Sequence, residues 1–178
     1  MILPEVNVKN ILYPTDLSDN ARYAFAYAVS LANLYGAKIT ILHVMPEDQS
    51  IFESHVAGYI KSEKWEEIKA AHYNQARESL IGKQRDHVMI REVLDQFSEE
   101  SKGQMGRTIG VPADEILIER GNPVEQILKQ CREKACDMIV MGSRGHSTLA
   151  DVVMGTITKR VLRRSEKPVL VVRLPDED

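Results

Sequence analysis

The chain contains 178 residues, 43% of them hydrophobic, and carries a formal net charge of −3 at neutral pH. This length and composition are typical of one compact domain, which we expect to span residues 1–178. The small acidic excess excludes a general electrostatic attraction to nucleic acid or to an anionic membrane surface. An anionic ligand would therefore have to be held by a local feature of the fold.

Neither a membrane span nor a secretion signal is visible in the sequence. No apolar run approaches the roughly 18 residues that cross a bilayer, and the start of the chain lacks a basic segment followed by an apolar one. We expect a cytoplasmic protein that does not insert into membranes. Cys131 and Cys136 have a spacing that fits neither a zinc site nor a CxxC redox motif, so we interpret both as reduced structural residues.

Short apolar runs predict the strands of a sheet. The runs are continuous rather than alternating, which is typical of parallel strands buried on both faces. They occupy residues 11–13, 39–45, 116–118, 138–141 and 169–172.

Helical patterns fill the intervals between these runs. Residues 18–35 place apolar side chains three and four apart, with Ser18 or Asp19 as the expected cap and Gly36 as the expected end. Pro123 suits the first turn of a second helix, and Arg163-Arg164 complements the dipole at the end of a third. The expected buried faces are Val124, Ile127, Leu128 and Cys131 in the second helix, and Ile157, Val161 and Leu162 in the third.

This order of elements predicts an α/β fold: a doubly wound, five-stranded parallel sheet with helices on both faces, of the Rossmann-like kind. Parallel strands need crossovers, and right-handed crossovers cover both faces of the sheet. Residues 46–113 are too long for one plain crossover, so we expect a helical insertion there. It is either a solvated insertion with no special task, or the tip of its polar stretch from Ser98 to Gly110 acts as a lid or partner surface.

In such sheets, ligands bind beyond the carboxyl ends of the strands, where the strand order reverses. Two segments follow such strand ends: Pro14-Thr15-Asp16 and residues 142–158. Gly142 and Gly145 permit positive φ, and we expect them to let main-chain amides approach an anion. Gly155 would open the last helix with unpaired amides, supported by the hydroxyls of Thr156 and Thr158, so that two bends clamp a di- or triphosphate.

The cations Arg144, His146 and Lys159 lie nearby in the sequence and could help or could simply be solvated. The spacing excludes both a P-loop and the dinucleotide fingerprint GxGxxG. Two glycines three apart are by themselves more often a structural turn.

The complete string Gly142-x2-Gly145-x9-Gly155-Thr156 resembles the G-2x-G-9x-G-(S/T) motif of the ATP-binding universal stress proteins. The segments around Tyr13-Pro14-Thr15-Asp16, His43-Val44, Gly121-Asn122-Pro123 and Lys167-Pro168-Val169 are similar to the family's strand ends. The resemblance covers nearly the whole chain apart from part of the 46–113 insertion.

The resemblance implies a role for each matching residue. Asp16 would accept hydrogen bonds from the ribose hydroxyls, and Mg²⁺ or Mn²⁺ would be held mainly by the phosphates of ATP (or of ADP or AMP). The implied nucleotide-binding residues are Pro14, Thr15, Asp16, Val44, Met141, Gly142, Ser143, Arg144, Gly145, Gly155, Thr156, Ile157 and Thr158. The family also implies a homodimer joined through the last strands, a pairing that the apolar strand near the chain end favours as well.

Simpler roles remain open for some of these residues. Asp16 could merely cap the first helix, and His43, on a buried strand, is interpreted as a hydrogen-bonded core histidine. Ser143 has no evident histidine and carboxylate partners in the sequence, so we expect no catalytic nucleophile.

Three classes of function follow. The leading hypothesis is a nucleotide-dependent regulatory or stress-response protein with slow or no hydrolysis, because no base for γ-phosphate attack stands out. The alternatives are an ATP-hydrolysing or adenylyl-transferring enzyme and a scaffold that has kept only the fold.

Overall fold

The computed structural model describes residues 5–45, 113–145 and 154–173. Its strands are β1 (Asn10–Thr15), β2 (Lys38–Met45), β3 (Ala113–Arg120), β4 (Met138–Gly142) and β5 (Val169–Val172). The helices in the described ranges are α1 (Asp19–Tyr35), α5 (Pro123–Glu133) and α6 (Thr156–Arg164). The predicted insertion at 46–113 lies outside the described residues except for its last position, so its helices and its role stay predictions.

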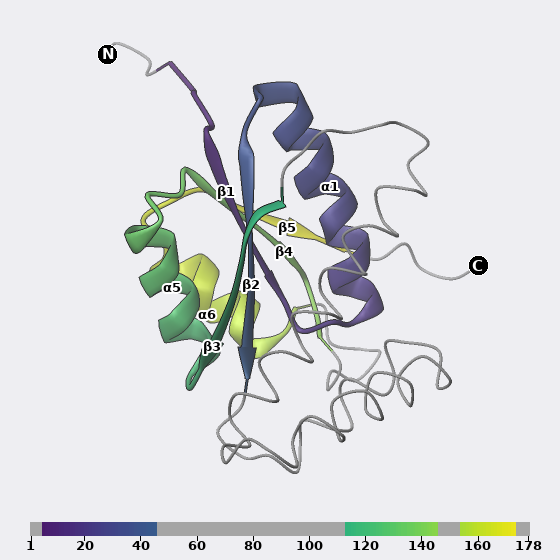
Figure 1. Cartoon of the computed structure of the whole chain (residues 1–178). Coiled ribbons are helices and arrows are strands. Elements are labelled where there is room, and N and C mark those ends of the chain that lie inside the picture. The colour runs from purple at the N-terminus through teal and green to yellow at the C-terminus, as the bar shows by residue number, and fades with distance from the viewer. Residues whose placement is uncertain (1–4, 46–112, 146–153, 174–178) are drawn as a thin grey trace, which may run out of the picture.

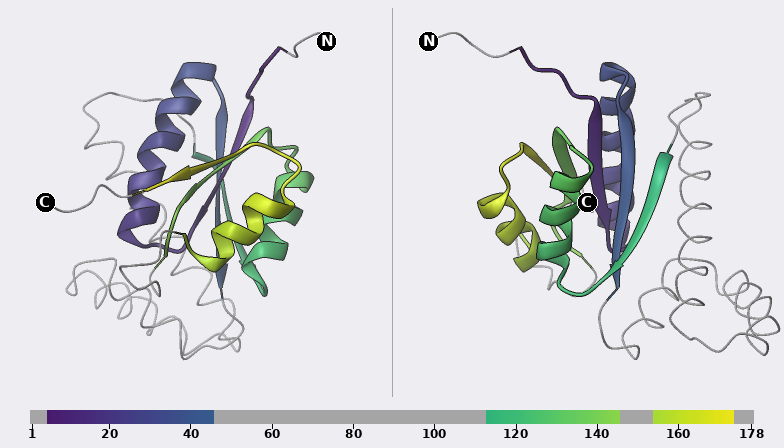
Figure 2. Two further views of the ribbon diagram at one scale, coloured as in Figure 1. Left: turned by 180° about the vertical axis from the view of Figure 1, so that it is seen from behind. Right: turned by 60° about the vertical axis from the view of Figure 1, so that its left-hand side comes forward.

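All strands pair in parallel in one five-stranded sheet with the order β3-β2-β1-β4-β5 (Figure 1). Helix α1 covers one face of this sheet, and α5 and α6 cover the other (Figure 2). The predicted doubly wound α/β fold is therefore confirmed. The strand order reverses between β1 and β4, two neighbouring parallel strands whose carboxyl ends lie at the same edge of the sheet.

The core lies in two layers, one on each face of the sheet. Ile11 and Tyr13 of β1 pack with α1, whereas Leu12 between them packs toward α5 and α6. In β4, Val140 belongs to the α1 layer and Ile139 to the other. Because both faces are covered, successive side chains are all apolar, and this explains the continuous runs in the sequence.

Both predicted ends of α1 are confirmed. Ser18 is the N-cap, and its hydroxyl accepts a hydrogen bond from Ala21 N at 3.2 Å. Gly36 ends the helix in the left-handed conformation with φ +65°. The Tyr13 hydroxyl donates to the Ala21 carbonyl at 2.5 Å, which attaches the first turn of α1 to β1.

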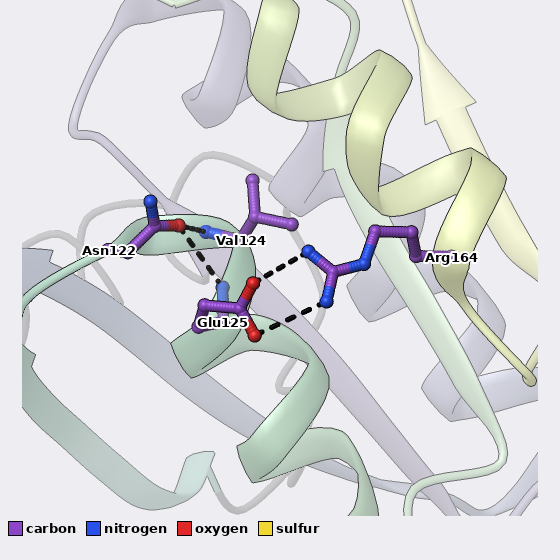
Figure 3. A network of polar contacts seen from close by, with 4 residues as sticks. All are labelled: Asn122, Val124, Glu125 and Arg164. Atoms are coloured by element: carbon purple, nitrogen blue, oxygen red, sulfur yellow. Dashed lines mark hydrogen bonds and ion pairs between the residues drawn. The ribbon is translucent and has the colours of Figure 1, made fainter.

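Helix α5 buries the predicted face of Val124, Ile127, Leu128 and Cys131. The Asn122 side chain caps its start by accepting from Val124 N at 3.0 Å and Glu125 N at 3.3 Å (Figure 3). Glu125 also pairs with Arg164 of α6, with the closest nitrogen and oxygen 2.6 Å apart (Figure 3). The two helices on this face of the sheet are thus linked at their surface.

The predicted burial of α6 is wrong in part. Val161 is fully buried, but Ile157 and Leu162 are 42% and 47% exposed. Thr158, one turn before Val161, takes the inward position instead and is 4% exposed. A polar side chain can occupy this position because its hydroxyl finds a hydrogen-bond partner, described below.

Among the residues that the structure describes, no helix has the length and apolar character needed to span a bilayer. Cys131 and Cys136 are both free thiols in the buried layer, as interpreted from their spacing.

Candidate functional site

A cavity of about 470 Å³ lies at the carboxyl ends of β1, β2 and β4. The first turns of α5 and α6 form part of its wall. This position, at the reversal of the strand order, is where open α/β sheets bind ligands. The lining residues are Pro14, Thr15, Asp16, Ala21, Leu42, Val44, Pro123, Ile127, Met141, Gly142, Arg144, Gly145, Gly155, Thr156, Ile157 and Thr158.

The structure brings twelve of the thirteen predicted residues together in this lining. The exception is Ser143, which is fully buried and does not line the cavity. Its contribution is made by its main chain, because Ser143 N donates to the Val172 carbonyl at 2.7 Å and Ser143 O accepts from Gly155 N at 2.8 Å. Ser143 thus connects β4, β5 and the start of α6.

Four lining residues were absent from the predicted set: Ala21, Leu42, Pro123 and Ile127. Leu42 could have been found from Val44, because alternate residues of a strand share one face. Pro123 follows the end of β3, and Ile127 lies one helical turn further along the same face. With Ala21, these residues give the cavity an apolar part of its wall.

The two bends are hydrogen-bonded directly to each other, whereas the predicted clamp had a ligand between them. Gly155 N already donates to Ser143 O, and the Thr158 hydroxyl donates to Gly142 O at 3.0 Å inside the protein. The expectation that the Gly155 amide and the Thr158 hydroxyl are directed at a ligand is therefore wrong. Both groups hold the Gly142–Gly145 bend against α6.

The start of α6 keeps the features of an anion site. Gly155 is its N-cap and provides no side-chain acceptor, and the first turn contains no acidic residue. Amides at the first turn of a helix have no partner within the helix, and the helix dipole is positive at this end. Thr156, Ile157 and Thr158 bring this turn to the cavity wall.

Neither Gly142 nor Gly145 adopts the positive φ that glycine permits. In the described part of the chain, only Gly36 and Gly121 are glycines in the left-handed region. Gly142 and Gly145 are needed for space: a methyl group at 142 would lie 3.0 Å from Asn20 Nδ2, and one at 145 would overlap Asp16 Oδ2.

Asp16 does not cap α1, so that alternative is also wrong. Ser18 is the cap, and Asp16 Oδ1 accepts from both Ser18 N at 3.1 Å and Ser18 Oγ at 2.6 Å. These bonds fix the Asp16 carboxylate beside Gly145 at the cavity wall.

His43 is a buried core residue, as interpreted from the sequence. It is 6% exposed, and its Nδ1 lies 2.9 Å from the Thr15 carbonyl. Because a carbonyl only accepts, Nδ1 carries the hydrogen in this contact. His43 therefore attaches the end of β1 to β2.

The main-chain direction of Val44 follows from its neighbour. Met45 O accepts from Gly121 N at 3.2 Å, so the Met45 carbonyl faces the β3 side. Successive strand residues direct their carbonyls to opposite sides, so the Val44 carbonyl faces the β1 side. There β1 ends at Thr15, and the Leu17 amide beyond it donates to the Thr15 hydroxyl at 3.0 Å. The Val44 carbonyl thus lies at the cavity edge beyond the end of β1.

Comparison with known proteins agrees with the motif. The chain matches the model of the universal stress protein family over residues 7–173. Over 174 residues it is 31% identical to the universal stress protein MJ0577 of Methanocaldococcus jannaschii, covering 94% of this chain and 96% of that protein. The solved structure of MJ0577 superposes with a TM-score of 0.63 at 26% identity, covering 97% and 100% of the two chains.

Two further solved structures share the fold at lower identity. A universal stress protein in complex with cAMP has a TM-score of 0.57 at 20% identity, covering 96% of this chain and 100% of that one. The protein from Archaeoglobus fulgidus in complex with dAMP has a TM-score of 0.54 at 18% identity, covering 94% and 98%. The chain described here is a member of the universal stress protein family.

Proposed function

We propose that the cavity binds an adenine nucleotide, ATP first and ADP or AMP as alternatives. In this proposal the protein is a nucleotide-dependent regulatory or stress-response protein with slow or no hydrolysis. The observation that carries the proposal is that both glycine bends of the motif and an apolar wall line one cavity of about 470 Å³.

The phosphates would lie between the Gly142–Gly145 bend and the first turn of α6. That turn has amides without a partner within the helix, a positive dipole end and no side-chain cap. Lys159 and Arg160 follow in the same helix and are exposed. These local features would hold an anion on a chain whose net charge is −3.

The base would lie against the wall that Leu42, Val44, Pro123 and Ile127 form. At its edge, the Val44 carbonyl can accept a hydrogen bond but cannot donate one. It would therefore favour adenine, which has an exocyclic amine, over guanine, which has a carbonyl oxygen at the corresponding position. Asp16, fixed by Ser18, would accept from the ribose hydroxyls.

A divalent cation would be held mainly by the phosphates. In the described ranges, no cluster of three or more histidine, cysteine, aspartate or glutamate side chains could hold a metal ion. Mg²⁺ commonly binds through phosphate oxygens and few protein ligands, so the residues present fit a cation that arrives with the nucleotide.

The cAMP and dAMP complexes of two relatives support an adenine nucleotide as ligand, although neither relative is close in sequence. Slow or no hydrolysis is proposed because Asp16 is the one carboxylate among the described lining residues and is assigned to the ribose. Hydrolysis normally needs a further group that positions the attacking water. Adenylyl transfer, the alternative, would release pyrophosphate in the presence of an acceptor.

Binding is tested by calorimetric titration of the purified protein with ATP and GTP, with mass spectrometry of any nucleotide that survives purification. We expect ATP to bind more tightly than GTP and to raise the melting temperature. The variant Gly155→Val should lose ATP, because valine tolerates the φ of −66° and ψ of 157° at this position but adds bulk at the start of α6. Equal ATP affinity in wild type and Gly155→Val would refute the proposed site.

We also propose a homodimer joined through β5. This strand is at an edge of the sheet and pairs only with β4 among the described strands. An apolar edge strand offers unpaired main-chain groups to a second copy. Analytical ultracentrifugation at micromolar concentration should give twice the mass of one chain, and a monomer there would contradict this assembly.

A further inference from the structure

Asn20 lies in the first turn of α1 and is absent from both the motif and the cavity lining. Its side chain is 5% exposed, and its Nδ2 donates to the main-chain carbonyl of Arg144 at 2.6 Å. The two residues are 124 positions apart in the sequence. This bond joins the N-terminal half of the fold directly to the Gly142–Gly145 bend.

The orientation of the Asn20 amide leaves one of its two polar atoms without a hydrogen bond in the described part of the chain. Its Oδ1 is buried and has no hydrogen-bond partner among the described residues, and a buried acceptor in that state destabilises a protein. Rotating the amide by 180° would place Oδ1 against the Arg144 carbonyl, so that two acceptors face each other. The amide orientation is therefore set by the bond to Arg144.

Asn20 completes a set of bonds that hold three successive carbonyls of the bend. Gly142 O accepts from Thr158 Oγ1, Ser143 O accepts from Gly155 N, and Arg144 O accepts from Asn20 Nδ2. The described chain contains no cis peptide bond. In a trans peptide the N–H points opposite to the carbonyl, so fixing the Arg144 carbonyl also fixes the direction of the Gly145 N–H.

The glycine at 142 makes room for this arrangement. A methyl group there would lie 3.0 Å from Asn20 Nδ2 and 3.2 Å from Asn20 Cγ, which is closer than carbon atoms normally pack. The absence of a side chain at position 142 thus leaves room for the Asn20 amide.

We propose that Asn20 is a positioning residue for phosphate binding: its amide sets the direction of the peptide group between Arg144 and Gly145 without touching the ligand. This inference rests on the proposed nucleotide site. It predicts that Asn20 controls affinity for the phosphate part of a ligand and leaves affinity for the nucleoside part unchanged.

The test compares wild type, Asn20→Ala and Asn20→Leu, the second of which keeps most of the side-chain volume. Asn10→Ala is the matched control, because Asn10 Nδ2 also donates to a distant main-chain carbonyl, that of Ala135 at 3.4 Å, at the opposite end of β1. Dissociation constants are measured by calorimetry for ATP, AMP and adenosine, and melting temperatures are measured without ligand.

We expect both Asn20 variants to bind ATP and AMP about tenfold more weakly, the scale of one lost hydrogen bond. Adenosine affinity should change less than about twofold, and Asn10→Ala should match wild type for every ligand. Asn20→Ala removes the unpaired Oδ1, which stabilises the protein, and also removes the donor to the Arg144 carbonyl, which destabilises it. Because these two effects oppose each other, the melting temperature should change little.

Other outcomes separate the two proposals. If wild type binds ATP and the Asn20 variants bind it equally well, the positioning role is overturned and the nucleotide site stands. If adenosine loses affinity as much as ATP, Asn20 supports the whole fold and the positioning role is again overturned. If wild type binds none of the three ligands, the proposed function itself fails and this inference fails with it.

Discussion

The Asp16 carboxylate lies directly against the Cα of Gly145, so close that a side chain at position 145 would overlap Asp16 Oδ2. The first strand end and the glycine bend after β4 are thus in contact. Gly145→Ala should displace the carboxylate and sharply weaken ATP binding while leaving the fold intact, because the φ of residue 145 lies outside the left-handed region. Calorimetry and a melting curve measure the two effects.

Gly36→Ala is the control variant, in which stability should fall and ATP affinity should stay unchanged. Gly36 has φ +65° and open space around its Cα, so alanine should cost about 1 kcal/mol of stability through backbone strain. Because Gly36 is at the far end of α1 from the cavity, the ATP affinity of Gly36→Ala should equal that of wild type. An ATP-binding defect in Gly36→Ala, or wild-type binding by Gly145→Ala, would contradict the contact argument.

Thr158 is predicted to stabilise the fold through its hydroxyl. Thr158→Val keeps the shape of the side chain but leaves the buried Gly142 carbonyl without its donor at 3.0 Å. The free energy of unfolding, measured in urea, should fall by about 1–3 kcal/mol. Thr158→Ser keeps the hydroxyl and should retain most of the stability; a larger loss in Thr158→Ser than in Thr158→Val would show that the methyl group matters instead.

The edge of β5 can be blocked without disturbing its pairing with β4. The carbonyls of Pro168 and Val172 accept from Ile139 N and Ser143 N, so their main-chain groups face β4. By alternation, the main chain of Val171 faces outward. Val171→Pro removes an outward N–H and should convert a dimer into a folded monomer in sedimentation; an unchanged dimer would place the interface elsewhere.

The Glu125–Arg164 pair predicts how the stability of the protein changes with pH. The hydrogen bond from Arg164 and its positive charge lower the pKa of the Glu125 carboxyl. A lowered pKa in the folded state stabilises the protein above the usual pKa and ceases to do so as the pH falls through the lowered value. Glu125→Gln should therefore melt slightly below wild type at pH 7, with the gap closing in acid; because both side chains are exposed, a large gap would be unexpected.

The two thiols should differ in reactivity. A hydrogen bond with Cys136 lowers the pKa of the Cys131 thiol, and the same bond together with burial raises that of Cys136. Because the thiolate is the nucleophile, iodoacetamide should modify Cys131 before Cys136 in the native protein, both slowly since both are buried. Peptide mapping by mass spectrometry gives the order, and faster modification of Cys136 would contradict it.

The sheet could be predicted from sequence because its signals are local. Each strand contains a mostly apolar run, and the ends of α1 are marked by Ser18 and Gly36 within a few residues of the periodic pattern. Twelve lining residues of the cavity could be predicted because the spaced glycine motif and the segments similar to the family's strand ends name them, and the strand order places them together.

What could not be predicted depends on contacts between distant segments. The inward position of Thr158 depends on the Gly142 carbonyl, and the space requirement of Gly145 depends on Asp16. Asn20 carries no periodic or motif signal, because its partner is 124 residues away. A glycine in a sequence suggests unusual φ, but only the neighbours of its Cα reveal whether the need is for space.

The separation of these segments along the chain also bears on how the protein folds. Asp137, just before β4, accepts hydrogen bonds from the amides of Lys9 and Asn10 at the start of β1, more than a hundred residues earlier. Contacts of such high sequence separation are slow to form. A chain still emerging from the ribosome has no cavity until β4 has docked beside β1, so binding at the proposed nucleotide site would report, during refolding, that β4 and the start of α6 have docked beside β1.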